Sequence, residues 1–213
     1  MDKPVIIFGA KGIATAALEI FKSNGIVVYG FLDDDKQTHG QEIDDVSVLG
    51  NTDDHGFLKL IGQKCEAFVA TDENSLRKKW VKMLMDSRKV MPMNAVHQSA
   101  IISSFATIGH GNFINSRVTV GASAKVGQHC IINSGATLEH DVEIGDYVQI
   151  GAGSTISPGV KIEEGAFIGS GVTVVGGVTI GKNARIGAGS VVVSNIEAKE
   201  TVFGNPAISV KKK

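Results

Sequence analysis

Cysteine, net charge and long apolar runs are all scarce in this sequence of 213 residues. Cys65 and Cys130 stand alone, with neither the spacing of a metal site nor a disulfide framework, which favours a reducing compartment. The 21 basic residues balance 22 acidic ones, so no charge excess directs the chain to nucleic acid or an anionic membrane. No stretch approaches the ~20 apolar residues of a membrane span, and the apolar run near the N-terminus is too short for a signal peptide. We therefore expect a cytoplasmic protein with no nucleic acid partner, no membrane span and a solvated basic tail at 211–213.

Glycine, in contrast, is abundant at 26 residues, and it takes part in a repeat of six residues. Every sixth position from Ile102 to Val192 is isoleucine, leucine or valine. The position four residues later is mostly small or β-branched, as at Ala106, Val118 and Ala124. Glycine often follows the aliphatic residue directly, at positions 109, 121, 127, 145, 151, 169, 181 and 187. Such a regular period predicts a hexapeptide-repeat architecture.

A six-residue period fits neither a helix face, which recurs every 3.6 residues, nor a simple amphipathic strand, which alternates every two. It fits a short strand followed by a turn, with three such sides in each coil. The aliphatic side chains would then point into a narrow prism, and stacked coils would pair as parallel strands about 4.8 Å apart. Residues 102–191 hold five uninterrupted coils, each stabilised by its neighbours. We predict an all-β parallel coil over 102–195 and a C-terminal extension at 196–213.

The segment before the repeat alternates apolar strands with helices. Leu76, Trp80 and Leu84 share one face of a predicted helix, and Gly25 is suited to end an earlier one. This alternation is typical of a parallel sheet with crossover helices. We therefore predict an α/β, Rossmann-like domain over 1–93 and a linker at 94–101. Its strands are expected at 4–9, 26–32, 66–71 and 89–93, and its helices at 13–25 and 73–87.

A glycine loop follows the first predicted strand. Gly9, Gly12 and the later Asp33 are ingredients of a dinucleotide site, where glycines admit phosphate to a helix N-terminus and the acid binds a ribose. The loop reads GAKGIA rather than G-x-G-x-x-G, which is weak support for NAD. For Asp33 and Asp34 alone, a turn after a strand is the simpler interpretation. The pattern leaves open whether this domain binds a nucleotide.

Several motifs, taken in order along the chain, resemble one bacterial family. They are the glycine loop, FLDD at 31–34, AVHQSAIIS at 95–103, the hexapeptides, LEHDVEIGD at 138–146 and GNPA at 204–207. Together they resemble the sialic acid O-acetyltransferases and the UDP-4-amino-sugar N-acetyltransferases, which are hexapeptide-repeat sugar acyltransferases. The resemblance covers essentially the whole chain. It implies a left-handed parallel β-helix, acetyl-CoA as co-substrate, and a homotrimer with active sites between protomers.

His140 lies within the LEHDVEIGD motif. Acetyl transfer needs a group that takes a proton from the attacking nitrogen or oxygen, and histidine is suited to this near neutral pH. The positions one coil before and after, Ala122 and Pro158, carry little bulk, so the imidazole has room to project. The family's motif places the orienting carboxylate directly after the histidine, here at Asp141. Because neighbours in a straight strand point to opposite sides, Asp141 reaches His140 only if the chain bends there.

Other histidines offer alternatives. A lone histidine on a solenoid is usually an ordinary surface residue, and His140 alone could be one. We expect His110 and His129, which lack an aspartate neighbour, to be solvated or to lie at trimer contacts. Some hexapeptide coils resembling γ-carbonic anhydrases bind zinc through three converging histidines. The spacing of His110, His129 and His140 does not match that pattern, so we predict no metal site.

The resemblance also implies where the donor lies. In the family, coenzyme A runs between neighbouring coils and is held largely by main-chain groups. The contact positions correspond to Gln149, Ser170 and Ala188. Relatives carry a histidine where Gln149 stands, although glutamine can still donate a hydrogen bond. Taken alone, Ser170 and Ala188 also fit ordinary repeat turns.

The acceptor is expected in the N-terminal domain, which holds the UDP part of the substrate in the N-acetyltransferases that the chain resembles. Their loop is closer to G-x-S-G-H-G, so here a lysine and an isoleucine replace a serine and a histidine. A lysine can pair with a diphosphate, but the change leaves the sugar open. The corresponding positions are Lys11, Gly12, Ile13, Asp33, Asp34 and Asp72.

The first hypothesis is therefore an acetyl-CoA-dependent transferase that N-acetylates a UDP-4-amino-4,6-dideoxy sugar, with His140 as general base. No serine or cysteine is evidently paired with a base, which favours direct attack over an acyl-enzyme. One alternative is O-acetylation of sialic acid or a related glycan sugar. Another is a non-catalytic solenoid that binds a nucleotide sugar and releases no coenzyme A.

Overall fold

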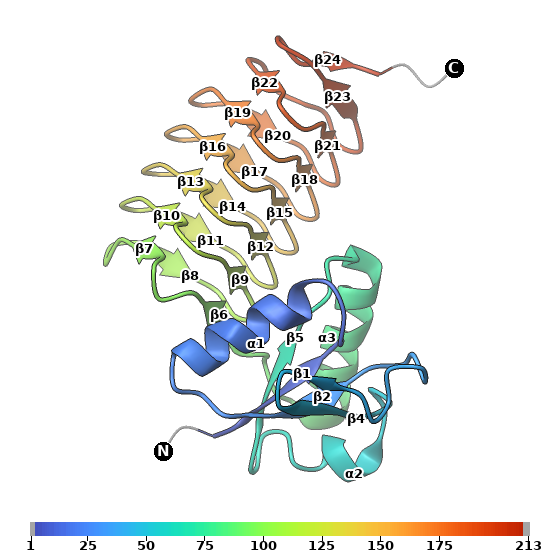
Figure 1. Cartoon of the computed structure of the whole chain (residues 1–213). Coiled ribbons are helices and arrows are strands. Elements are labelled where there is room, and N and C mark those ends of the chain that lie inside the picture. Colours follow the sequence, from blue (N-terminus) through green and yellow to red (C-terminus); the bar gives the residue numbers. More distant parts are fainter. Residues whose placement is uncertain (1–2, 211–213) are drawn as a thin grey trace. The chain divides into compact units, whose positions relative to one another are not determined.

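The computed structural model describes residues 3–210, which form two compact units that divide between Gln98 and Ser99. The helices belong to the first unit, and the second is built from short strands and turns (Figure 1). None of the helices in residues 3–210 has the length and apolar character needed to cross a membrane. The basic run at 211–213 lies outside the described residues.

A mainly parallel sheet forms the centre of the first unit, in the order β3-β4-β2-β1-β5. Strand β1 pairs in parallel with β2 and β5, β2 pairs in parallel with β4, and β3 is an antiparallel edge strand. Since parallel strands end at the same edge, the loops after β1, β2, β4 and β5 meet there. The strands are β1 (Val5–Phe8), β2 (Val28–Leu32), β3 (Glu42–Ile43), β4 (Val46–Gly50) and β5 (Glu66–Val69).

Three helices accompany this sheet: α1 (Ile13–Ser23), α2 (His55–Leu58) and α3 (Asn74–Arg88). Helix α1 contacts β2, and α3 contacts β5. Phe21 of α1 and Phe68 of β5 are fully buried and meet edge to face, with ring centroids 5.4 Å apart. Aromatic pairs in this geometry stabilise a core by ~0.5–1.5 kcal/mol beyond their buried area.

The predicted strands at β1, β2 and β5 and the predicted helices at α1 and α3 are confirmed. The predicted strand at 89–93 is wrong. Helix α3 ends at Arg88, and Lys89 follows in the left-handed region with φ 57°. Pro92 has no N–H to donate to a ladder, and the segment is tied to the sheet by Met93, whose N–H donates to the Ala67 carbonyl at 2.9 Å. A short strand, β6 (Ala95–Val96), follows instead.

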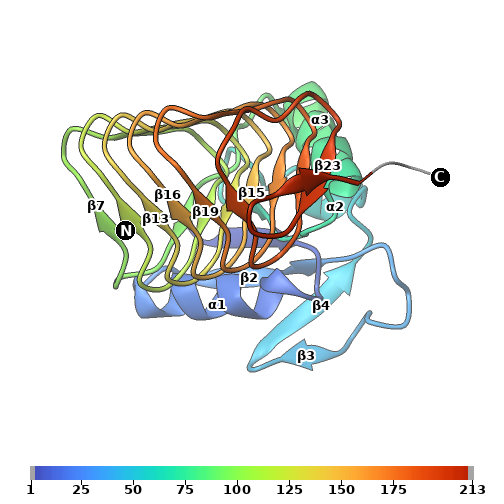
Figure 2. The same ribbon diagram turned by 90° about the horizontal axis from the view of Figure 1, so that it is seen from above.

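The second unit is a coil with three sheets, in which successive coils pair as parallel strands; it is seen from above in Figure 2. The first sheet contains β7 (Ile101–Ile102), β10 (Thr119–Val120), β13 (Thr137–Leu138), β16 (Thr155–Ile156), β19 (Thr173–Val174) and β22 (Val191–Val192). The second contains β8 (Thr107–Ile108), β11 (Lys125–Val126), β14 (Glu143–Ile144), β17 (Lys161–Ile162) and β20 (Thr179–Ile180). The third contains β9 (Phe113–Ile114), β12 (Ile131–Ile132), β15 (Gln149–Ile150), β18 (Phe167–Ile168), β21 (Arg185–Ile186), β23 (Thr201–Phe203) and β24 (Ile208–Ser209).

The register of the coil follows the sequence repeat. Thr119 pairs with Thr137, and Thr137 pairs with Thr155, one coil further on each time. The predicted period and its five coils are therefore confirmed. The sixth-position aliphatic residues are buried from Ile114 to Val192, whereas Ile102 and Ile108 are half-buried. The first coil has a neighbouring coil on one side only, which is the end effect expected of a solenoid.

The coil continues beyond its last hexapeptide. Strand β23 pairs in parallel with β21, and β24 turns back antiparallel to β23. Residues 201–209 therefore extend the third sheet by two further strands.

Candidate active site

His140 and Asp141 form the turn between β13 and β14, at one corner of the coil. The imidazole Nδ1 lies 2.9 Å from Oδ2 of Asp141, and the two side chains are 59% and 63% exposed. With the Nδ1 proton assigned to this contact, Nε2 holds the free lone pair. Nε2 makes no hydrogen bond within residues 3–210. The pair is therefore an oriented base that is open to a reactant.

The bend that brings Asp141 to His140 lies in the backbone of Asp141, whose φ is 59°. Glycine takes the corresponding corner position in the two following coils, at Gly159 with φ 69° and at Gly177 with φ 74°. Aspartate tolerates this left-handed region better than most other residues. The Asp141 N–H donates to the Ala122 carbonyl at 3.0 Å, and the Gly159 N–H donates to the His140 carbonyl at 3.2 Å. The turn is thus held between two neighbouring coils.

The three predicted donor contacts lie on or just after the third sheet of the coil. Gln149 begins β15, Ser170 follows β18, and Ala188 follows β21 one coil further on. The backbones approach closely there, since a Cβ added to Gly169 would lie 2.6 Å from the Ala188 nitrogen. Ser170 and Ala188 are exposed, so this corner presents main-chain groups beside small side chains.

One chain does not bring all of these residues together. His140 lies at the corner between the first and second sheets, whereas Ser170 and Ala188 lie at the corner between the third and first sheets. His140 and Gln149 belong to the same coil but to different sides of it. His140 and the corner that contains Ser170 and Ala188 therefore lie apart within one chain.

A cavity of about 290 Å³ lies where β1, β2 and β5 end, and we call it the glycine-loop cavity. Gly12 and Ile13 are not among its lining residues; they form the start of α1, which has no side-chain cap. The structure therefore brings four of the predicted acceptor residues together and leaves these two beside them. The lining consists of Gly9, Lys11, Asp33, Asp34, Ala70, Thr71, Asp72, Glu73, Leu76 and Trp80.

The acidic residues of this cavity differ in their roles. Asp33 accepts from the Ala10 N–H and the Asp35 N–H, both at 2.8 Å, so it fixes the glycine loop. Lys11 Nζ lies 2.5 Å from Asp35 Oδ2, and this hydrogen bond raises the pKa of Lys11 and lowers that of Asp35. The charge of Lys11 is therefore already paired. Asp34 points instead to an adjoining space.

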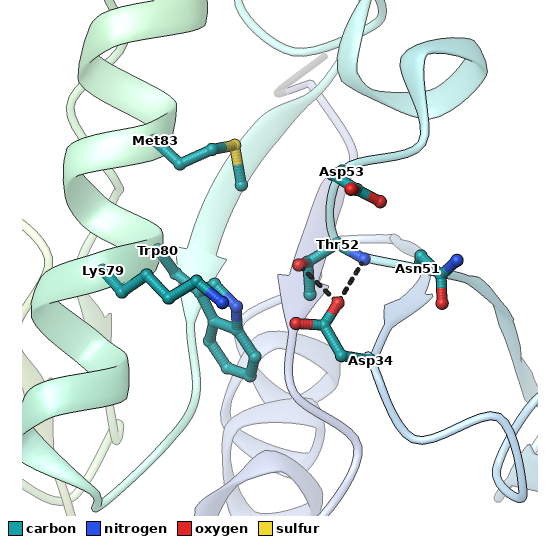
Figure 3. A pocket seen from close by; sticks show the side chains of 7 residues that line it. All are labelled: Asp34, Asn51, Thr52, Asp53, Lys79, Trp80 and Met83. Carbon is teal, nitrogen blue, oxygen red and sulfur yellow. Dashed lines mark hydrogen bonds between the residues drawn. The ribbon is translucent and has the colours of Figure 1, made fainter.

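That adjoining space, the Asp53 cavity, measures about 270 Å³ and shares Asp34 and Trp80 with the glycine-loop cavity. Oδ1 of Asp34 accepts from the Thr52 N–H at 3.0 Å and from the Thr52 hydroxyl at 2.6 Å (Figure 3). Burial raises the pKa of Asp34, but hydrogen bonds from Thr52, aided by Trp80 and Lys79, hold it below its ordinary value. The lining is Asp34, Asn51, Thr52, Asp53, Lys79, Trp80 and Met83.

Comparison with known families matches both units of the chain. Residues 4–84 match the PglD N-terminal domain. Residues 105–140, 123–158 and 159–194 match the bacterial transferase hexapeptide, described as six repeats. No curated protein sequence gives a significant match.

Solved structures match the chain over nearly its full length. The structure of PerB from Caulobacter crescentus, in complex with CoA and GDP-perosamine, has a TM-score of 0.89 and 32% identity. The match covers 98% of this chain and 97% of PerB. This chain belongs to the hexapeptide-repeat sugar acyltransferases. The acetyltransferase domain of PglB from Neisseria gonorrhoeae FA1090, in complex with acetyl coenzyme A, matches with a TM-score of 0.88 and 26% identity, over 99% of this chain and 100% of that domain.

The family predicted from the sequence motifs is thereby confirmed, and so is the fold. The first unit of this acyltransferase is the Rossmann-like α/β domain, and the second is the left-handed parallel β-helix. Within residues 3–210, no three His, Cys, Asp or Glu side chains gather in a way that could hold a metal ion.

His129 differs from the expectation that it is solvated or at a trimer contact, since it is buried within one chain of the acyltransferase at 4% exposure. Its ring lies against Tyr147, with centroids 5.0 Å apart. The ring occupies the space over Gly111, where an added Cβ would lie 2.2 Å from the His129 Nδ1. His110 is exposed.

Sequence reasoning missed most of the Asp53 cavity. Asn51, Thr52 and Asp53 directly follow β4, whose alternating Val46 and Val48 are buried. That alternation was a usable strand signal, and polar residues after a parallel strand are typical of a ligand edge. The helical spacing of Leu76, Trp80 and Leu84 predicts that Trp80 faces the core. This accounts for the burial of its ring but does not predict that Trp80 also lines the cavity.

Proposed function

We propose that this acyltransferase transfers an acetyl group from acetyl-CoA to the amino group of a nucleotide-linked amino sugar, with His140 as general base. The observation that carries the proposal is the contact of 2.9 Å between His140 Nδ1 and Asp141 Oδ2, which leaves Nε2 open. The relatives support the donor and the substrate class, since PerB binds CoA and GDP-perosamine and the PglB domain binds acetyl coenzyme A.

In the proposed reaction, the sugar amine attacks the thioester carbonyl, and a C–N bond forms. Nε2 of His140 takes a proton from the attacking nitrogen, and Asp141 stabilises the imidazolium that results. The C–S bond then breaks, the electron pair leaves with sulfur, and the coenzyme A thiolate recovers a proton. A positioned general base of this kind contributes about 10²–10⁴-fold to the rate.

The donor is proposed to lie along the corner that contains Ser170 and Ala188, with Gln149 beside the acetyl end. Since His140 lies at a different corner of the coil, the base and the donor come from different protomers. A homotrimer, as the family resemblance implies, would pair the His140 corner of one protomer with the donor corner of the next. In a cyclic trimer whose axis runs along the coils, equal coils lie at equal heights, which matches His140 and Gln149 in one coil.

The acceptor nucleotide is proposed to occupy the glycine-loop cavity and the Asp53 cavity. Phosphate groups are favoured near the uncapped N-terminus of α1, where backbone N–H groups are unpaired within the helix. The motifs favoured a UDP-4-amino-4,6-dideoxy sugar, whereas PerB binds a GDP sugar. Both classes therefore belong in the first assay.

The test is thiol release from acetyl-CoA with UDP-amino sugars, GDP-amino sugars and sialic acids, followed by mass spectrometry of the acceptor. Release that depends on a nucleotide amino sugar, and that falls about 100-fold or more in His140→Ala, is the expected result. His110→Ala is the matched control, because it removes another exposed histidine of the coil. Release with sialic acid alone, or a fully active His140→Ala, contradicts the proposal.

A further inference from the structure

The interior of the coil contains a serine at a position where the repeat favours an apolar residue. Ser154 is fully buried, and the matching positions one coil before and one coil after it are Ala136 and Val172. Burying a hydroxyl group is unfavourable unless the group is hydrogen-bonded. The partners of Ser154 therefore indicate what this hydroxyl does.

Both partners lie in the turn that contains Ser170. The Ser154 hydroxyl donates to the Gly169 carbonyl at 2.9 Å and accepts from the Val172 N–H at 3.2 Å. Within residues 3–210, the Val172 N–H makes no direct hydrogen bond to the Gly169 carbonyl. The hydroxyl thus bridges the first and last residues of the turn 169–172.

The corresponding turns one coil before and one coil after close without such a bridge. Across the turns 151–154 and 187–190, the last residue donates its N–H directly to the carbonyl of the first, at 3.3 Å in both. The side chains that lie one coil before the last residues of these turns are Ala136 and Val172, which carry no hydroxyl. The Ser154 hydroxyl thus distinguishes the bridged turn from its two neighbours.

The bridge orients a main-chain donor on the outside of the coil. The Gly169 carbonyl and the Ser170 N–H belong to one planar, trans peptide group, so they point in opposite directions. Because Ser154 holds the carbonyl toward the buried interior, the N–H is directed away from it. This N–H makes no hydrogen bond in the part of the chain that the structure describes, and Ser170 is exposed. It is therefore available to an acceptor such as an amide carbonyl of coenzyme A.

We propose that Ser154 is a positioning residue for the acetyl donor: its hydroxyl sets the direction of the Ser170 N–H, which binds coenzyme A. The proposal rests on the proposed function, in which the donor lies along the corner that contains Ser170. Without the hydroxyl, the Val172 N–H would bond directly to the Gly169 carbonyl, as in the neighbouring turns. The peptide group would then rotate, and coenzyme A would lose a well-aligned donor although the turn remains closed.

Titration calorimetry of the full chain with coenzyme A tests this proposal in four proteins: the wild type, Ser154→Ala, Ser170→Pro and the double variant. Ser154→Ala should weaken binding about two- to tenfold, which is the range of one hydrogen bond. Its melting temperature should stay near that of the wild type, because the two turn groups still bond to each other. Ser170→Pro removes the N–H itself and should weaken binding at least as much.

Proline is suited to this position of the turn. Gly171 has φ 66°, as the third residue of a type II turn requires, and proline is favoured at the second residue of such turns. Pro158 already takes the same place in another turn of the coil, before Gly159 with φ 69°. Ser170→Pro should therefore fold, so that weaker binding does not come from a disrupted turn.

The double variant separates a positioning role from a merely structural one. If Ser154 acts through the Ser170 N–H, removing its hydroxyl has no further effect once that N–H is absent. The double variant should then bind coenzyme A as Ser170→Pro does. Losses that multiply in the double variant overturn the proposal, as does wild-type affinity in Ser154→Ala or in Ser170→Pro. A wild type that does not bind coenzyme A overturns it as well.

Cys130→Ala is the matched control, because Cys130 is also buried in the coil and its thiol donates to a turn carbonyl, that of Gly145, at 3.1 Å. This turn lies at the corner between the second and third sheets. The variant should bind coenzyme A like the wild type, and a loss equal to that of Ser154→Ala would contradict a specific role for Ser154. Binding of coenzyme A needs neither the acceptor nor His140, so this outcome is separate from thiol release, which tests the proposed function.

Discussion

Replacing Asp141 by glycine separates the role of its carboxylate from the role of its backbone. Asp141 has φ 59°, and the same corner position is already glycine at Gly159 and Gly177 in the next two coils. A left-handed conformation costs an ordinary L-residue about 1–2 kcal/mol, which glycine does not incur, so Asp141→Gly should fold with an unchanged or higher melting temperature. The substitution removes only the group that holds His140 Nδ1 at 2.9 Å.

The expected loss of rate follows from the solvation of the His140–Asp141 pair. An exposed ion pair contributes ~1 kcal/mol at most, which corresponds to about fivefold in kcat. If bound substrates exclude water, an effective dielectric constant near 20 raises the attraction of charges about 4 Å apart to ~4 kcal/mol, or about 10³-fold. We therefore expect kcat for acetyl transfer to fall between about fivefold and 10³-fold.

The assay is steady-state thiol release for the wild type, Asp141→Gly and His140→Ala, with melting temperatures measured on the same samples. Ser123→Gly is the matched control, since Ser123 takes the equivalent corner position one coil earlier with φ 59° and has no histidine before it. A fully active Asp141→Gly beside an inactive His140→Ala would refute the orienting role. A melting temperature that falls together with the rate would show that the loss is structural.

Three further predictions concern stability and assembly. Ile150 is fully buried inside the coil, so Ile150→Ala should lower the free energy of unfolding by ~2–5 kcal/mol in urea titrations, and a loss below ~1 kcal/mol would contradict the packed prism. The pKa of Asp34 is below its ordinary value, so its carboxylate stabilises the fold above the unfolded pKa of ~3.9 and loses this contribution as the pH falls through the folded value. Asp34→Asn should therefore be less stable than the wild type at pH 7 and equally stable near pH 2; a difference that persists in acid would contradict this. Light scattering should give three times the chain mass of 22.4 kDa, whereas a monomer active at the same concentration would contradict a shared site.

The sequence alone determined the architecture of the coil. When strands and turns alternate, a branched aliphatic residue at every sixth position can point into the interior of a three-sided coil. The observed pairing of Thr119 with Thr137 and of Thr137 with Thr155 follows that period. Strand β1 and helices α1 and α3 could also be predicted from the sequence, because apolar runs and helical faces are local patterns.

Tertiary structure decided the geometry around His140. The motif placed an aspartate after the histidine, but only the left-handed backbone of Asp141, held by the neighbouring coils, brings the two side chains into contact. It also decided that His129 is buried, because the space for its ring comes from Gly111 one coil away. Residues so far apart in the chain leave no local signal of their contact.

The Asp53 cavity shows the same limit. Asp34, Asp53 and Trp80 come from the end of β2, the end of β4 and the middle of α3, and each fits an ordinary turn or core position in the sequence. Their meeting in one cavity depends on the order of strands in the sheet, which places β4 beside β2. Local periodicity specifies which segments form strands and helices, whereas the positions of polar groups around a ligand depend on how those segments pack together.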